Sequence, residues 1–193
     1  MKSLAIYCGS ATPADPVYIE AARHVGRTLA ERDITVVYGG GRLGLMGAVA
    51  DSALAAGGKV IGVIPEALVD AEVAHQGCTE LRVVKNMHER KALFTDLSDG
   101  FVNLPGGVGT MDEMWEAVSW SQLGYHSKPV GILNIAGYYD HLIAFNAHMA
   151  NVGFVREAHT GILIVAEEID ALLEKMTAYQ PHKNIFAMKA EDL

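Results

Sequence analysis

Residues 100–113 read GFVNLPGGVGTMDE, and this stretch decides the fold class. Gly100–Leu104 predicts a buried strand, Pro105–Thr110 is a glycine-rich turn, and a helix is predicted from there to about Leu123. A strand that passes through a tight turn into a helix is the building block of α/β folds.

The same strand–helix pattern extends from this stretch in both directions. Several of the strands are continuous apolar runs, which indicates burial on both faces, as in a parallel sheet covered by helices. The further strands are predicted at 3–8, 34–38, 59–64, 79–84, 129–133 and 162–165. Helices are predicted at 13–32, 45–56 and about 86–97, and one after each of the last two strands. We therefore expect one doubly wound, Rossmann-like α/β domain with a mainly parallel sheet over residues 1–180, and a polar tail at 181–193.

Composition narrows the class of protein. The 193 residues suit one domain, and 15 Lys and Arg against 23 Asp and Glu give a net charge of −8, which argues against nucleic-acid binding. No apolar run approaches the roughly 20 residues that cross a membrane. Cys8 and Cys78 do not make a disulfide scaffold; we expect both to be reduced and buried, in a reducing compartment such as the cytoplasm.

Three glycine-rich turns follow predicted strands, namely Gly9-Ser10, Gly39–Gly44 and Pro105–Thr110. In a parallel sheet all three lie at the carboxyl edge, where such folds bind ligands. Each turn leads into a helix, whose free N–H groups and dipole favour an anion such as phosphate. A single glycine turn is most often only a tight connection, but three on one edge predict a site.

Known nucleotide and metal motifs fit poorly. Gly39-x-Gly41-x-x-Gly44 formally matches the dinucleotide fingerprint, but it follows the second strand, and Pro65 crowds the acidic position at Glu66. No Gly-Lys-Ser/Thr follows any of the turns, which excludes a phosphate loop of nucleoside triphosphatases. Ala92 stands where a zinc protease motif beginning at His88 needs its second histidine. We expect no metal and no cofactor, and histidines at the surface or at helix ends.

Two pairs of polar or charged residues have two interpretations each. Thr110 and Glu113 fit a capping box, and Glu113 is also one helical turn from the expected phosphate site, where it could reach a ribose. Arg90 and Lys91 fit a solvated basic pair, and the fork of Arg90 also suits a phosphate or carboxylate. The residues alone leave both pairs open.

Together these motifs resemble the LOG (LONELY GUY) family. Residues 105–113, PGGVGTMDE, are similar to its PGGxGTxxE motif, and 87–91, MHERK, to its second block. The likeness extends through 38–47, 62–65, 120–124 and 128–131, in the same order, and spans roughly residues 3–165. The resemblance implies a phosphoribohydrolase that cuts the N-glycosidic bond of cytokinin riboside 5′-monophosphates into free base and ribose 5-phosphate. It also implies a homodimer with sites near the subunit interface.

The resemblance also implies roles for individual residues. Arg90 and Glu113 would be the catalytic pair. Substrate contacts would come, in addition, from Gly9, Ser10, Glu72, Met87, Lys91, Gly106, Gly107, Val108, Gly109, Thr110, Met111, Asp112 and Ser119. Ser119 stands where plant members carry Thr, which weakens that one assignment.

Other interpretations stay open at this point. A non-catalytic nucleotide or molybdenum-cofactor carrier is similar around the glycine loop, and a dinucleotide-dependent oxidoreductase is the third candidate. Similar proteins are also labelled lysine decarboxylases, but a pyridoxal enzyme needs a Schiff-base lysine and a larger body. The sequence shows neither the base that is accepted (adenine, an N6-isopentenylated adenine or another) nor the proton donor for the leaving base.

Overall fold

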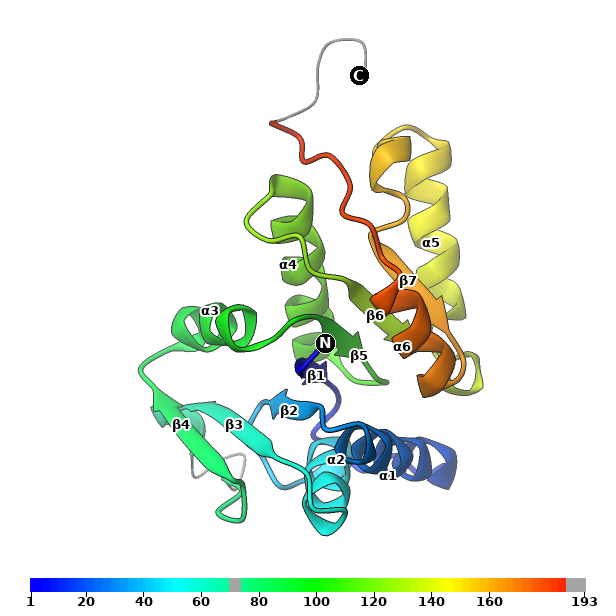
Figure 1. Cartoon of the computed structure of the whole chain (residues 1–193). Helices are drawn as coiled ribbons and strands as arrows, with labels where there is room; N and C mark the ends of the chain where they lie inside the picture. Colours follow the sequence, from blue (N-terminus) through cyan, green and yellow to red (C-terminus); the bar gives the residue numbers. More distant parts are fainter. Residues whose placement is uncertain (70–73, 187–193) are drawn as a thin grey trace.

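A seven-stranded parallel sheet forms the centre of the computed structural model, which describes residues 1–69 and 74–186 (Figure 1). Its strand order is β4-β3-β2-β1-β5-β6-β7. The strands are β1 (Ser3–Tyr7), β2 (Thr35–Tyr38), β3 (Val60–Pro65), β4 (Glu80–Val84), β5 (Phe101–Asn103), β6 (Val130–Leu133) and β7 (Leu163–Ala166). The chain builds outward from β1 to β4, returns to the other side of β1 and builds outward again. The predicted doubly wound fold is confirmed, and the sheet is parallel throughout.

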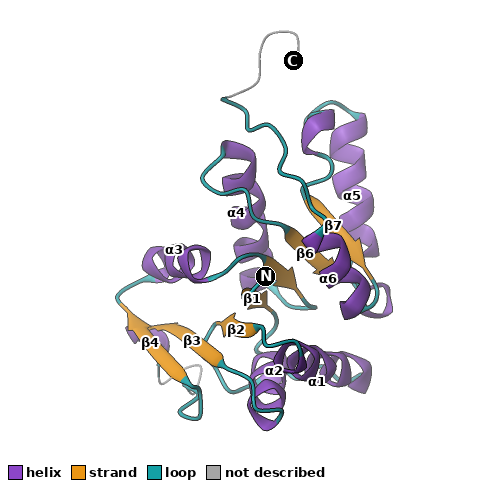
Figure 2. Ribbon diagram, viewed as in Figure 1, coloured by secondary structure: helices purple, strands orange, loops and turns teal. Residues whose placement is uncertain are grey.

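Helices cover both faces of the sheet (Figure 2). The helices are α1 (Pro16–Glu31), α2 (Gly44–Ala55), α3 (Met87–Leu97), α4 (Val108–Leu123), α5 (Asp140–Asn151) and α6 (Ile169–Thr177). Buried side chains of α1, α2 and α6 share one core cluster, whereas those of α3 and α4 belong to the clusters of the opposite face, against which the partly buried Leu142 and Ile143 of α5 pack. Three short 3₁₀ turns, 66–68, 135–137 and 157–159, complete the described elements.

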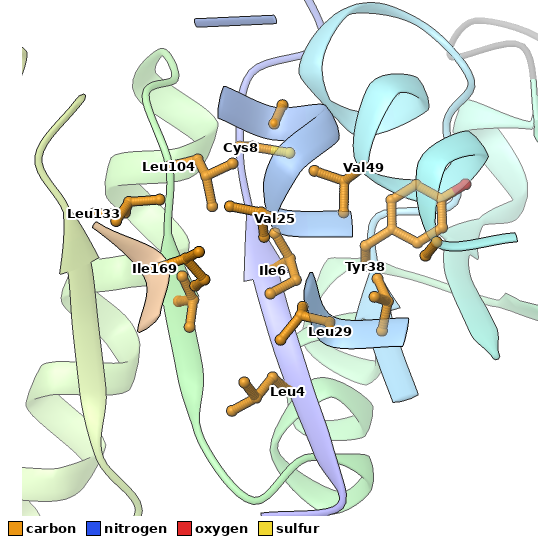
Figure 3. Packing of buried hydrophobic residues seen from close by; sticks show 14 of the residues in the cluster. Leu4, Ile6, Cys8, Val25, Leu29, Tyr38, Val49, Leu104, Leu133 and Ile169 are labelled. Atoms are coloured by element: carbon orange, nitrogen blue, oxygen red, sulfur yellow. The ribbon is translucent and has the colours of Figure 1, made fainter. Parts of the chain in front are cut away.

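The central strand β1 shows how the sequence divides its residues between the two faces. Leu4 and Ile6 pack with Val25, Leu29 and the rest of the α1/α2/α6 core (Figure 3). Ala5 and Tyr7 point to the other side and pack against α3 and α4. Because successive side chains of a strand alternate, a strand buried on both sides must be apolar at every position.

Helix starts follow the local capping chemistry. Helix α1 begins at Pro16, three residues later than predicted, because Asp15 accepts a hydrogen bond from the Val17 N–H (3.0 Å) and proline suits the first helical position. Helix α3 begins as predicted, with the side chain of Asn86 accepting from the Glu89 N–H at 3.0 Å.

His75 and His126 differ from the prediction of surface or helix-end positions, whereas His159 ends the 3₁₀ turn 157–159 but is buried. All three rings have at least one nitrogen in a hydrogen bond, which offsets part of the cost of burying a polar ring, although the buried Nε2 of His126 has no hydrogen-bond partner among the described residues. Both cysteines are free; Cys8 is buried as expected, whereas Cys78 is only partly buried.

The predicted tail begins beside α4. The His182 ring contacts the Ser121 carbonyl oxygen at 3.2 Å, and the Ile185 N–H donates to the Gln122 carbonyl oxygen at 3.1 Å. The boundary at residue 180 stays a prediction. None of the helices in the described ranges is both long and apolar enough to cross a membrane.

Burial of His126 predicts a loss of stability in acid. Burial lowers its pKa from 6.5 to about 4, and the ring packs 5.0 Å from the ring of Phe101. The unfolded chain takes up this proton at a higher pH than the folded chain, so stability falls as pH drops from 6.5 to 4. The expected loss is on the order of 3 kcal/mol.

The measurement is the melting temperature between pH 7 and pH 4.5 for the wild type, for His126→Leu and for the exposed-site control His24→Gln. We expect a shallower pH dependence for His126→Leu alone. An unchanged pH dependence in that variant would contradict the assignment.

Candidate active site

The three glycine turns meet at one edge of the sheet. The Gly9 N–H donates to the Pro105 carbonyl oxygen at 3.0 Å, and the Leu45 N–H donates to the Gly9 carbonyl oxygen at 3.0 Å. A Cβ atom on Gly44 would lie 2.3 Å from the carbonyl oxygen of Ala11, so a side chain there would push two turns apart. The turns follow the carboxyl ends of β1, β2 and β5, and the strand order reverses between β1 and β5, where α/β folds bind ligands.

The amino end of α4 is open. Its N-cap is Gly107, which provides no side-chain cap, and a Cβ atom on Gly107 or Gly109 would meet nothing within 4 Å. Val108 is 87% exposed. The first N–H groups of a helix have no partner within the helix, so this end of α4 can bind an anion through its backbone.

The capping-box interpretation of Thr110 and Glu113 is wrong. Helix α4 begins two residues before Thr110, which is therefore a helical residue and is buried. A Cβ atom on Gly106 would lie 2.1 Å from the Thr110 hydroxyl oxygen. The Thr110 side chain thus packs under the turn, and the turn needs glycine above it.

Arg90 is buried, with 5% of the residue exposed. Its Nη2 donates to the Gly39 carbonyl oxygen at 3.1 Å, and its guanidinium carbon lies 5.5 Å from the centre of the Phe94 ring. Its Nη1 lies 3.7 Å from the Met87 sulfur. The solvated-pair interpretation of Arg90 is therefore wrong: the side chain is held at the end of β2, beside the second glycine turn.

Lys91 links the amino ends of α3 and α4. Its Nζ lies 2.8 Å from a carboxylate oxygen of Asp112 and 3.0 Å from one of Glu116. Burial alone would lower the pKa of Lys91, but the two carboxylates outweigh burial, and the pKa is raised. The ion pairs of Lys91 therefore join α3, which carries Arg90, to α4, which carries Glu113.

Glu113 lies on α4, one turn beyond Thr110, and is partly buried. Burial raises the pKa of Tyr7, and the nearby charges of Glu113 and Glu116 raise it further, whereas the charge of Arg90 lowers it. Glu113 also adds to the effect of burial in raising the pKa of Cys8. Arg90 and Glu113 therefore both lie near the end of β1, with Tyr7 as their common neighbour.

Tyr7 is a site neighbour that the sequence analysis missed. It is buried against the rings of Phe94 and Phe101, at centroid distances of 5.5 and 5.9 Å. Its position two residues before Gly9, on the face of β1 opposite to Ile6, was the available signal.

The other predicted site residues differ in position and in burial. Ser10, Met87 and Asp112 are exposed near the open edge, and Met111 is partly buried on α4. Gly9 has its N–H engaged with Pro105, so it joins two turns. Ser119 lies nine residues beyond Thr110, about 14 Å along the helix, and lines a cavity between α4 and α5. Glu72 lies outside the described residues.

A small apolar hollow adjoins the glycine turns. It has a volume of about 230 Å³, and its lining includes Leu45, Gly107 and the two tyrosines Tyr18 and Tyr138. The Tyr138 hydroxyl donates to the Gly106 carbonyl oxygen at 2.6 Å. The described residues contain no group of three or more His, Cys, Asp or Glu arranged to hold a metal ion.

Comparison with known proteins identifies the family. A family model described as "Possible lysine decarboxylase" matches residues 46–176. A protein of Oryza sativa subsp. japonica named as a probable cytokinin riboside 5′-monophosphate phosphoribohydrolase is 44% identical over 180 residues, 93% of this chain and 79% of its own length. The chain belongs to the LOG family. A second member, from Rhodococcoides fascians and also named cytokinin riboside 5′-monophosphate phosphoribohydrolase, is 44% identical over 89% of this chain and 87% of its own.

Solved structures extend the likeness at the level of the fold. The molybdenum cofactor carrier protein of Chlamydomonas reinhardtii matches with a TM-score of 0.67 and 19% identity, over 92% of this chain and 98% of its own. At 19% identity, this match shows that the LOG fold is shared with carrier proteins. It shows nothing about ligands.

Proposed function

We propose that this LOG-family chain hydrolyses the N-glycosidic bond of a nucleoside 5′-monophosphate, with adenine or an N6-modified adenine as the base. The products are the free base and ribose 5-phosphate. The observation that carries the proposal is the open amino end of α4. Glu113 lies on this same helix, and Arg90 lies on the neighbouring helix α3. The names of the family members at 44% identity support the same reaction.

The phosphate would bind at the amino end of α4. The N–H groups of residues 107–110 and the helix dipole favour a doubly charged anion there, and the absence of a side-chain cap among the described residues leaves room for it. Gly106 and Gly107 would let the phosphate approach the backbone. The remaining contacts of the proposal are Gly9, Ser10, Glu72, Met87, Lys91, Met111, Asp112 and Ser119.

The ribose would lie between the two catalytic side chains. Breaking the bond from C1′ to the base builds positive charge on the sugar, as in glycoside hydrolysis generally. The Glu113 carboxylate would stabilise that charge and take a proton from the attacking water. Arg90, fixed by Gly39, would hold the phosphate or ribose and pair with Glu113. The leaving base takes up a proton from a donor that is not assigned.

A homodimer is part of the proposal. Ser119 lies too far along α4 to contact a nucleotide whose phosphate binds at the amino end of the same helix. In a dimer, Ser119 would instead contact the nucleotide bound by the second copy of the chain. We expect light scattering after gel filtration to give about twice the 20.7 kDa chain mass. A single-chain mass would contradict the dimer.

The two free cysteines support a reducing, cytoplasmic setting.

Gly39 offers a test of how Arg90 is held. A Cβ atom on Gly39 would lie 2.2 Å from Arg90 Nη2, so Gly39→Ala must displace the guanidinium. A shift of about 1 Å in a catalytic group costs about a hundredfold in rate. We expect a loss of kcat/KM of that order in a steady-state assay with AMP. Gly161→Ala is the control, because its Cβ atom would meet nothing within 4 Å; equal activity of the two variants would contradict this role of Gly39.

Product analysis tests the reaction itself. The pure protein is incubated with AMP and with isopentenyladenosine 5′-monophosphate, and the products are separated by chromatography. The proposal predicts equal amounts of free base and ribose 5-phosphate, and the ratio of the two rates reports the base preference. If no base appears and a bound ligand copurifies, the carrier interpretation replaces the enzyme.

A further inference from the structure

His75 is a buried histidine that the proposed reaction does not use. Its side chain is 10% exposed, and its Nε2 lies 2.9 Å from a carboxylate oxygen of Asp51 on α2. The Gly77 N–H donates to its Nδ1 at 3.1 Å, which fixes the ring proton on Nε2, facing Asp51. Both ring nitrogens are therefore engaged, and the ring joins the start of the segment 74–78 to α2.

The same segment holds the second glycine turn through its backbone. The His75 N–H donates to the Gly40 carbonyl oxygen at 2.8 Å, and Ala74 forms an antiparallel bridge with Gly41. Gly40 has a φ of +78°, and a Cβ atom there would lie 3.1 Å from the Ile64 side chain. The turn thus packs closely between β3 and the segment that carries His75, and the contacts on both sides restrict its movement.

The preceding residue of this turn, Gly39, holds Arg90. The Gly39 carbonyl oxygen accepts from Arg90 Nη2 at 3.1 Å, and the guanidinium lies directly against the Gly39 Cα. A continuous series of contacts therefore runs from Asp51 through the His75 ring, the His75 N–H and Gly40 to the Gly39 carbonyl group that orients Arg90.

We propose that His75, held by Asp51, is a positioning residue for Arg90. The His75 ring fixes the Gly39–Gly41 turn, and this turn sets the direction of the Arg90 guanidinium. His75 itself does not touch the substrate. The proposal rests on the proposed function for its kinetic effect, because Arg90 matters there for phosphate or ribose binding. Its structural part, the coupling of the His75 ring to the Arg90 side chain, can be measured without turnover.

A double-mutant cycle separates positioning from a general loss of folding. His75→Ala is expected to lower kcat/KM for AMP about tenfold in the wild-type background and less than twofold in an Arg90→Ala background. His75→Gln, which retains a donor toward Asp51, and Asp51→Asn, which retains an acceptor, should stay within threefold of the wild type. Equal losses in the two Arg90 backgrounds, or no loss from His75→Ala, would overturn the proposal.

The second readout is the NMR signal of the Arg90 guanidinium Nε–H, assigned by its absence in Arg90→Ala. We expect this signal to shift or broaden in His75→Ala and to stay in place in His75→Gln and in the exposed-site control His24→Ala. An unchanged Arg90 signal in His75→Ala would overturn the proposal. If the wild type releases no base, the proposed function fails, and the NMR result still decides whether His75 positions Arg90.

Discussion

Glu113→Gln is expected to lower kcat for AMP hydrolysis by about a thousandfold and to leave the affinity for AMP within a few-fold of the wild type. The amide keeps the size of the side chain but has neither the negative charge that opposes the developing positive charge on the ribose nor the basicity to take a proton from water. The phosphate contacts at the amino end of α4 do not depend on this carboxylate, so binding should persist. Single-turnover assays give the rate, and calorimetry gives the affinity.

Glu174→Gln is the matched control, because Glu174 is an exposed glutamate on α6, on the opposite face of the sheet. It should behave as the wild type in both measurements. A Glu113→Gln protein that hydrolyses AMP at the wild-type rate would remove Glu113 from the chemistry, and one that no longer binds AMP would assign it to binding.

Arg90→Ala is expected to lower kcat/KM by about a thousandfold, with a loss in both rate and affinity. A buried, charge-assisted contact is worth about 2–5 kcal/mol when one partner is removed, and 1.4 kcal/mol corresponds to a tenfold change. Arg90→Lys should recover little of this, because an ammonium group lacks the fork that reaches Gly39 and a ligand together. Steady-state kinetics with AMP measure the loss.

Arg23→Ala is the control for this prediction. Arg23 pairs with Glu20 on the exposed face of α1 at 2.6 Å, and such surface pairs contribute little. Thermal unfolding of each variant separates a loss of folded protein from a loss of function. An unchanged kcat/KM in a folded Arg90→Ala protein would remove Arg90 from the site.

The elements of the fold could be predicted from the sequence because their signals are local. Apolar runs such as Gly100–Leu104 and the cap at Asn86 appear in the structure within one or two residues of the predicted limits. Strand order has no such local signal: β5 returns to pair with β1, almost a hundred residues earlier, through contacts such as Ala5 with Phe101. Only the assembled core determines that pairing.

The parts of the candidate site that could be predicted from the sequence are those in which the backbone geometry requires one residue type. The glycine turns were found because only glycine permits their close contacts, as Gly44 illustrates. Thr110 was misplaced because threonine with a glutamate three residues later fits a cap equally well, and the open end at Gly107 has no distinguishing residue. The pairing of Lys91 with Glu116 and that of His75 with Asp51 join separate elements, so spacing along the chain could not reveal either.

The most direct test of the central claim is the ratio of kcat/KM for AMP to that for adenosine, measured as release of adenine by the same protein preparation. If the amino end of α4 anchors the phosphate through two or more charge-assisted hydrogen bonds, AMP should be preferred by about a thousandfold. Adenine released from adenosine as fast as from AMP, or from neither compound, would contradict a phosphate-anchored phosphoribohydrolase.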